Sequence, residues 1–231
     1  MSRNRPRGTR RPTRWVAAGL VAWGLIGLVG SAAVLVTRYQ TVTIPNASME
    51  PGLRVGDQLL LETGSAAVGR GDVVLFKAPG WDLIGSPYEL KRVLGIGGDQ
   101  LVCCDAAGKL RVNGEVLIEP YLRADDGTTP ATPFSVVVPA GRLFLLGDNR
   151  AGSSDSREHL DLDSGTVPVD SVQGLAVAVV LPVGRAAKVG PASSRPGRVQ
   201  LWQLAVVMTS TALLGLLVAA GLYRRLSRRS I

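Results

Sequence analysis

The sequence predicts a mostly β domain held between two transmembrane helices. Residues 15–36 and residues 201–223 each form an apolar run without a charged side chain. At a rise of 1.5 Å per residue, each run covers roughly 33 Å as a helix, enough for a hydrocarbon core of about 30 Å. Between the two runs, short apolar or alternating segments recur between Gly, Pro and Asp residues, as expected of strands and turns.

The basic residues are concentrated at the two ends of the chain. The 231 residues include 26 Lys and Arg against 18 Asp and Glu, for a net charge of +8. Residues 1–14 contain six arginines, residues 224–231 contain four, and neither segment contains an acid. The central domain therefore lacks the basic excess typical of a nucleic-acid-binding protein. Arginines outside both apolar runs predict cytoplasmic termini and an extracytoplasmic central domain.

The chain is accordingly divided into six segments. A cleaved signal peptide is the alternative for the first apolar run, but that run is longer than the 7–15 residues usual there. The expected segments are a basic N-terminus (1–14), a transmembrane helix (15–36), the extracytoplasmic domain (37–183), a Gly/Pro/Ser-rich linker (184–200), a second transmembrane helix (201–223) and a basic tail (224–231).

Eight segments of the central domain have the composition of strands. Asn113–Gly114 is a hairpin signal, and residues 124–133 are expected to form a polar surface loop. The predicted strands are Gln58–Glu62, Asp72–Lys77, Glu89–Leu94, Gln100–Cys104, Lys109–Val112, Phe134–Val138, Arg142–Leu146 and Val172–Leu181.

The two cysteines, Cys103 and Cys104, are adjacent in the sequence. They lie on the oxidising side of the membrane, but neighbouring cysteines can bridge only through a strained ring. We therefore do not expect a disulfide, and two small buried residues beside a strand are an equally good interpretation. With a single histidine, the pair also argues against an all-protein zinc site, and neither a metal nor a cofactor is expected.

A lysine is the best candidate for a general base. His159, the only histidine, lies in a polar stretch and is expected on the solvated surface. The chain has four lysines against 22 arginines, and Lys91 lies in an apolar predicted strand. A free lysine has a pKa of about 10.4, so a lysine base needs a drop of roughly 3 units, which burial can supply. A strand lysine that faces solvent is the alternative.

A serine between two prolines is the candidate nucleophile. Pro45 and Pro51 lie three residues on either side of Ser48 and restrict the backbone to a short turn. A polar loop, residues 146–157, follows a later apolar strand. Asp155 and Arg157 are close enough in this loop to pair and hold it against the core, although simple turn chemistry also explains such a composition.

Together these segments resemble the type I signal peptidases of bacteria, which are membrane-bound Ser/Lys endopeptidases. The resemblance covers roughly residues 42–181 and implies a signal-peptidase-like β fold, and a second C-terminal span is similar to the arrangement in some actinobacterial members. The matching segments are PNASMEPGL (45–53), RGDVVLFK (70–77), LKRVLGIGGDQL (90–101), LGDNRAGSSDSRE (146–158) and GTVPVDSVQGLA (165–176).

The resemblance implies a role for each matched residue. Ser48 would attack the scissile carbonyl to form an acyl-enzyme, and its backbone amide would donate one oxyanion hydrogen bond. Lys91 would accept the Ser48 proton, and the Ser153 hydroxyl would orient the lysine nitrogen. Asp155 and Arg157 would brace the loop.

Asn46 departs from the family pattern. This position often carries a serine whose hydroxyl is the second oxyanion donor. A side-chain amide also donates in other oxyanion holes, so Asn46 is the candidate here. The departure leaves a second hypothesis open, a catalytically silent membrane-anchored adaptor with a peptidase-like fold.

The substrates implied by the resemblance are secretory preproteins with small residues at positions −1 and −3. An extended peptide would add as a strand beside residues 42–45 and the strand that carries Lys91. Ile44, Met49 and Leu90 are candidates for lining shallow apolar pockets, although each is as readily plain core. The expected partners are preproteins and membrane lipid, with no nucleic acid and no metal.

Overall fold

The computed structural model describes residues 13–63, 68–77, 80–81, 87–122 and 133–189. The chain forms two units, residues 1–37 with 193–231 and residues 38–192, which are described separately. The first unit contains α1, Thr13–Arg38, a helix of 26 residues over the first apolar run. Within the described ranges, no helix meets the combined length and hydropathy needed to cross a membrane. The second apolar run, residues 201–223, lies outside these ranges.

The second unit consists of strands and short 3-10 helices. Its strands are β1 (Tyr39–Thr43), β2 (Gln58–Thr63), β3 (Val73–Lys77), β4 (Tyr88–Ile96), β5 (Gln100–Cys103), β6 (Arg111–Val112), β7 (Glu115–Val116), β8 (Phe134–Val137), β9 (Arg142–Leu146), β10 (Thr166–Pro168), β11 (Val172–Leu181) and β12 (Ala187–Lys188). Its 3-10 helices are η2 (Ser156–Glu158), η3 (Asp163–Gly165), η4 (Val169–Ser171) and η5 (Val183–Arg185).

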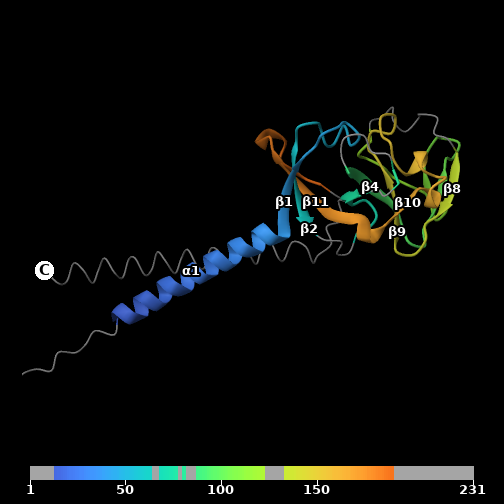
Figure 1. Ribbon diagram of the computed structural model, residues 1–231. Helices are drawn as coiled ribbons and strands as arrows, with labels where there is room; N and C mark the ends of the chain where they lie inside the picture. The colour runs from blue at the N-terminus through green and yellow to red at the C-terminus, as the bar shows by residue number, and fades with distance from the viewer. Residues whose placement is uncertain (1–12, 64–67, 78–79, 82–86, 123–132, 190–231) are drawn as a thin grey trace, which may run out of the picture. The chain divides into compact units, whose positions relative to one another are not determined.

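The strands form a large and a small antiparallel sheet (Figure 1). The order in the large sheet is β1-β2-β11-β3-β4-β9-β10, with β12 on β11, and the order in the small sheet is β7-β6-β5-β8. The long strand β11 pairs with both β2 and β3, and its register shifts in both pairings. Such irregularities bend a strand. Consistent with a curled sheet, Ile44, Leu90 and Ala176 pack in one hydrophobic cluster, although Ile44 follows β1 and Leu90 belongs to β4, with three strands between them in the sheet.

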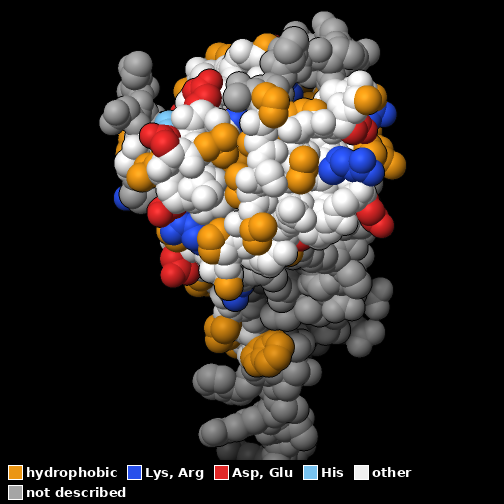
Figure 2. Space-filling model, turned by 90° about the vertical axis from the view of Figure 1, so that its right-hand side faces the viewer, with side chains coloured by type: hydrophobic (Ala, Val, Ile, Leu, Met, Phe, Trp, Pro, Cys, Tyr) orange, Lys and Arg blue, Asp and Glu red, His pale blue; other side chains and the backbone are white. Residues whose placement is uncertain are grey.

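The described hydrophobic side chains of the β unit form three clusters. One cluster lies under β3, β9 and β11 and includes Phe76, Leu145 and Leu175. A second joins the small sheet to β4 and β9 and includes Phe134 and Phe144, whose ring centroids are 5.3 Å apart. On the face drawn in Figure 2, basic, acidic and apolar side chains are interspersed. No single basic surface covers this face.

The mostly β class of the central domain is confirmed. A strand overlaps each of the eight predicted segments. At the Asn113–Gly114 turn both residues have positive φ, 54° and 82°, as a two-residue hairpin between β6 and β7 requires. The first residues of the expected linker form η5 and β12, and most of the expected polar loop lies outside the described ranges.

The cysteine pair differs from expectation. Cys103 and Cys104 are joined by a disulfide at the end of β5, so the expectation that adjacent cysteines stay unbridged is wrong. Cys103 is 5% exposed and packs in the second cluster, with Cys104 against it. The interpretation as small buried residues beside a strand holds for Cys103, whereas Cys104 is half-buried.

Asp99 organises the turn between the two sheets. Its carboxylate accepts hydrogen bonds from Arg70 at 2.6 Å, from the Ile96 amide at 2.9 Å and from the Asn113 side chain at 2.9 Å. Burial alone would raise the pKa of Asp99, but these hydrogen bonds outweigh it and hold the pKa below its ordinary value. A carboxyl group with a lowered native pKa stabilises the fold above its unfolded pKa of about 3.9, and this contribution is lost as the pH falls through the native pKa.

We predict that Asp99→Asn lowers the free energy of unfolding of the full-length protein by about 1–3 kcal/mol at pH 7, because three donors lose an ionised acceptor. The difference from the wild type should shrink below about pH 4. Denaturant unfolding followed by near-UV circular dichroism measures both values. The exposed Asp161→Asn serves as the matched control and should change neither value. An equal loss at pH 7 and at low pH would contradict this role for Asp99.

Candidate active site

The serine loop, residues 44–53, is a tight turn held at both ends. The Ile44 amide donates to the Asp57 carbonyl at 2.9 Å, and the Gly56 amide donates to the Ile44 carbonyl at 2.9 Å. Inside the loop, the Leu53 amide donates to the Met49 carbonyl at 3.1 Å. Met49 is fully buried in the cluster that contains Ile44. This anchoring presents Ser48, 6% exposed, on a turn with little freedom.

The backbone amide of Ser48 is already engaged. It donates to Oδ1 of Asn46 at 3.2 Å. The carbonyl oxygen of the Asn46 side chain, and not its NH2 group, therefore faces the Ser48 amide. Asn46 is exposed, whereas Ser48 is buried. The two expected oxyanion donors are therefore adjacent, but in this arrangement one satisfies the other.

The strand β4 places Lys91 at a change in its pairing. Residues Tyr88–Arg92 pair with β3, whereas β9 pairs with β4 only from Arg92 onward. Within the described residues, the edge of β4 that faces away from β3 is therefore unpaired over residues 89–91. In the part of the chain that the structure describes, β1 is the last strand of the sheet and pairs only with β2. Two free backbone edges thus belong to the segments that flank the serine loop and the lysine.

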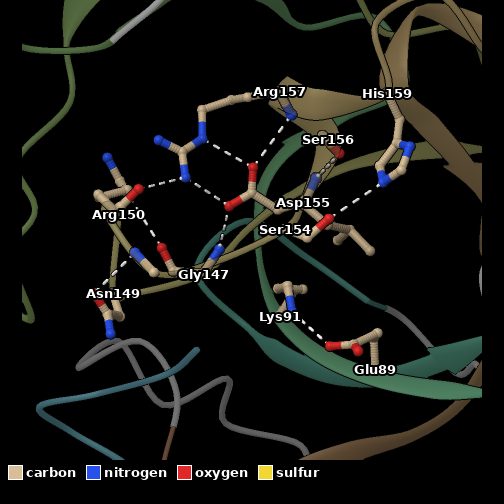
Figure 3. Close-up of polar contacts among 12 residues, drawn as sticks. Glu89, Lys91, Gly147, Asn149, Arg150, Ser154, Asp155, Ser156, Arg157 and His159 are labelled. Atoms are coloured by element: carbon tan, nitrogen blue, oxygen red, sulfur yellow. Dashed lines mark hydrogen bonds and ion pairs between the residues drawn. The ribbon is translucent and has the colours of Figure 1, made fainter. Parts of the chain in front are cut away.

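Lys91 is buried, with 1% of its surface exposed. Its Nζ donates to Oε2 of Glu89 at 2.6 Å, forming an ion pair on the same face of β4 (Figure 3). No hydrogen bond joins Lys91 to Ser48 or to Ser153 among the residues described. The solvent-facing alternative for Lys91 is thus wrong, and the amine has a carboxylate as its partner.

The opposite face of β4 carries a second buried cation. Arg92 donates from Nε and Nη2 to the two carboxylate oxygens of Asp148, at 2.8 and 2.6 Å. It also lies over the Tyr121 ring, 4.0 Å from the centroid. Burial acts to lower the pKa of Arg92, but the bonds to Asp148 outweigh it and raise the pKa. Alternation along the strand thus separates Arg92 and its acid from the face that carries Lys91.

The loop after β9, residues 147–157, docks on the serine loop. The Asn149 amide donates to the Ser48 carbonyl at 3.0 Å, and the Asn149 side chain donates to the Ala47 carbonyl at 3.1 Å. These two bonds span more than a hundred residues of sequence and join the loop directly to the backbone of the candidate nucleophile.

Asp155 and Arg157 fasten this loop to the sheet. Asp155 is fully buried and accepts from Nε and Nη2 of Arg157, both at 2.8 Å, and from the Gly147 amide at 3.0 Å (Figure 3). Arg157 also donates to the Arg150 carbonyl at 2.9 Å. Burial acts to lower the pKa of Arg157, but the bonds to Asp155 outweigh it and raise the pKa. The guanidinium therefore keeps its charge at physiological pH.

Gly147, Ser153 and the Ser48 carbonyl meet at one point. A Cβ added at Gly147 would lie 2.6 Å from the Ser48 carbonyl oxygen and would overlap the Ser153 side chain. Ser153 is 6% exposed, and its hydroxyl is buried without a hydrogen-bond partner in the described part of the chain. The Ser153 hydroxyl is therefore available to hydrogen-bond with a group that arrives at this point.

The expected lining residues are all buried. Ile44, Met49 and Leu90 are 3%, 0% and 8% exposed and belong to one cluster. This is the plain-core alternative for Met49, whose side chain has no exposed surface. Leu90 precedes Lys91 on the unpaired edge of β4, and Ile44 follows β1, so both lie beside a free backbone edge.

His159 is half-buried rather than solvated. Its ring stacks on Trp81, with centroids 4.2 Å apart, and its Nε2 lies 3.5 Å from the Ser154 hydroxyl. Trp81 is 5% exposed and packs in the first cluster. The contact with the exposed Ser154 is at the outer limit of a hydrogen bond, and we assign no nucleophile to it.

A family model and several curated relatives match this chain. The model described as signal peptidase, peptidase S26 matches residues 13–181. The chain belongs to this signal peptidase family. A probable signal peptidase I from Mycobacterium leprae (strain TN) is 35% identical over 211 residues, covering 67% of this chain and 73% of the relative. The signal peptidase I of Mycobacterium tuberculosis (strain H37Rv) is 35% identical over 206 residues, covering 67% and 69%.

Two further matches come from other bacteria. The signal peptidase IB of Staphylococcus aureus (strain COL) is 34% identical over 161 residues and covers 62% of this chain and 78% of the relative. Among solved structures, a signal peptidase I from Enterococcus faecalis V583 is 28% identical, with a TM-score of 0.38, and covers 47% of this chain and 96% of that structure.

Sequence reasoning missed three residues of this candidate site: Glu89, Gly147 and Asn149. Glu89 had a signal, because a residue two positions before Lys91 in a strand lies on the same face. Gly147 and Asn149 lie inside a matched segment, yet their contacts with the serine loop depend on tertiary packing. Local sequence carried no sign of those contacts.

We predict that Gly147→Ala disables the signal peptidase site, because the new methyl group meets the backbone oxygen of Ser48, which has little room to move. Cleavage of a preprotein should fall by at least about tenfold, since a displacement of about 1 Å near the reacting groups costs up to roughly a hundredfold. The matched control is Gly184→Ala, where the added Cβ meets nothing within 4 Å and the backbone is outside the left-handed region. This control should keep both its stability and its specific activity. Full activity in Gly147→Ala would contradict the close packing.

Proposed function

We propose that Ser48 and Lys91 carry out the reaction of this signal peptidase. The chain is a serine endopeptidase of the signal peptidase family and removes N-terminal signal peptides from secreted preproteins. The observation that supports the residue assignment is that Lys91, on the strand beside the serine loop, is only 1% exposed. The Ser153 hydroxyl, which has no hydrogen-bond partner among the described residues, also lies where Gly147 meets the Ser48 carbonyl oxygen. No observation favours the catalytically silent adaptor.

The proposed reaction begins when a neutral Lys91 takes the proton of the Ser48 hydroxyl. Ser48 Oγ then forms a bond to the scissile carbonyl carbon, and the carbonyl oxygen becomes an oxyanion. Lys91 returns the proton to the leaving amine as the peptide bond breaks, which leaves an acyl-enzyme on Ser48. A water molecule, deprotonated by Lys91, hydrolyses the ester and restores the serine.

The oxyanion requires a rearrangement at Asn46. The Ser48 amide donates to Asn46 Oδ1 at rest, so a substrate carbonyl must replace that acceptor. A half-turn of the Asn46 amide about its last torsion would then direct an N–H donor to the same oxygen. Two donors are the arrangement that stabilises the charge of a tetrahedral intermediate.

The proposed substrate binds as an extended strand. Among the described residues, one edge of β1 and one edge of residues 89–91 have no strand partner and offer backbone groups on both sides of the serine loop, and strand addition uses such edges. Ile44 and Leu90 lie on these edges and would line shallow pockets for small residues at −1 and −3, with Met49 beneath Ser48. Ser153, Asp155 and Arg157 would orient the lysine and brace its loop.

The proposed anchoring rests on the two apolar runs of the sequence. Residues 15–36 and 201–223 would each cross the membrane, with both termini cytoplasmic because the flanking arginines are retained on that side. The β unit would then lie outside the cytoplasm and contact membrane lipid. Proteolytic mapping of intact and opened vesicles tests this arrangement.

We predict that Ser48→Ala and Lys91→Ala each lower kcat/KM by at least about a thousandfold, because each removes a group that reacts directly. The assay uses the full-length protein in detergent micelles and a labelled preprotein with an Ala-X-Ala site. Lys109→Ala is the matched control, since Lys109 is exposed and outside the site. Substantial cleavage by folded Lys91→Ala would refute the Ser/Lys assignment.

We predict that Asn46→Ala lowers kcat by about a hundredfold or more, because the oxyanion loses a donor worth roughly 3 kcal/mol. Asn46→Ser should retain much of the activity, since its hydroxyl can donate from the same position. Single-turnover cleavage of the same preprotein separates the effect on the chemical step from the effect on binding. Equal rates for the Ala and Ser variants would show that residue 46 does not donate.

A further inference from the structure

Glu89 holds the amine of Lys91 in the structure. The two residues are two positions apart on β4, so both side chains leave the same face of the sheet. Glu89 Oε2 and Lys91 Nζ are 2.6 Å apart, and the side chains are 16% and 1% exposed. The contact is therefore a short, charge-assisted hydrogen bond that water barely reaches.

This contact opposes the task assigned to Lys91. A carboxylate within hydrogen-bond distance of an amine favours the protonated form of that amine. An ammonium group has no lone pair with which to accept the proton of Ser48. The Glu89–Lys91 pair is thus an arrangement in which the general base is occupied.

The Ser153 hydroxyl is a candidate second partner for the amine. The Ser153 hydroxyl is buried without a partner in the described part of the chain. It lies at the point where Gly147 meets the Ser48 carbonyl oxygen. An amine that left Glu89 would find there a hydroxyl oxygen able to accept its N–H, beside the candidate nucleophile.

Among the described residues, the other charged groups on the elements around Lys91 have partners of their own, and Arg92 with Asp148 lies on the opposite face of β4. In the loop after β9, the acids are paired with arginines, and residue 74 of β3, opposite Lys91, is a valine. On the serine loop, Glu50 has an interaction of its own. The acid–arginine pairs are Asp155–Arg157, Asp148–Arg92 and Glu119–Arg150.

We propose that Glu89 is a positioning residue that holds Lys91 in a protonated resting state, and that cleavage requires the amine to move from Glu89 to the Ser48 and Ser153 hydroxyls. In this step the ammonium loses one proton to water, and Glu89 remains a carboxylate. A peptide strand on the open edge of β4 would lie beside both side chains and separate them. The proposal rests on the proposed role of Lys91 as the general base.

The test is the pH dependence of kcat/KM for cleavage of a labelled Ala-X-Ala preprotein by the full-length protein in micelles. In Glu89→Gln the side chain keeps its shape but loses its charge, so the acidic limb of the profile should move to lower pH by about one unit or more. At a fixed pH on that limb, the variant should be about tenfold more active than the wild type. At high pH the two should agree within about threefold.

A purely structural role of Glu89 would give a different result. It would lower kcat/KM at every pH and leave the position of the limb unchanged. Glu115→Gln makes the same chemical change at an exposed position of β7 and should leave the whole profile unchanged. An unshifted limb in Glu89→Gln, or a folded variant that is inactive at every pH, would overturn the proposal.

Two further measurements keep the outcome decisive. If Glu89→Gln fails to fold, Glu89→Asp retains the charge on a shorter side chain and should shift the limb in the same direction by less. An unshifted limb in that variant would overturn the proposal. A wild type that does not cleave, or a Lys91→Ala variant that does, refutes the proposed function itself. An active wild type with an unshifted limb refutes only the role of Glu89.

Discussion

The site depends on the constraint that an amine excluded from water must either lose its proton or find an anion. Lys91 is 1% exposed, and in the structure its amine pairs with the carboxylate of Glu89. Burying an unpaired charge is costly, and the ion pair avoids that cost in the resting protein. The same pair keeps the amine from acting as a base. Stability of the resting fold and readiness for proton transfer therefore make opposite demands on one side chain.

The scaffold meets these demands by separating charges across a strand and by docking loops. Arg92 and Asp148 lie on one face of β4, and Lys91 and Glu89 lie on the other. The loop after β9 is fastened by the fully buried Asp155 and contacts the serine loop through Asn149. Because Gly147 has no side chain, the Ser153 side chain and the Ser48 backbone can both approach it closely. The Ser153 side chain and the Ser48 backbone are thus in place before any substrate arrives.

Strand composition and motif order predicted most of the sheet from the sequence. The strands that were missed explain the limits. β1 is a polar, largely exposed edge, β10 contains a proline, and β7 and β12 have two residues each. The motifs identified Ser48, Lys91, Ser153, Asp155 and Arg157 as candidates. They could not reveal that Asn46 accepts from Ser48 or that Lys91 binds Glu89, because rotamers and partners are decided by packing. The disulfide between Cys103 and Cys104 was missed because the argument against it was local. Packing of the folded unit also determines whether two cysteines pair.

A structure of the full-length protein with a peptide aldehyde ending in Ala-X-Ala tests the central claim most directly. The aldehyde carbon would bond to Ser48 Oγ and imitate the tetrahedral intermediate. The account predicts that Lys91 Nζ then lies within about 3.2 Å of the hydroxyl oxygens of Ser48 and Ser153, detached from the neighbouring acid. An adduct on Ser48 with the amine still bound to Glu89 would contradict it.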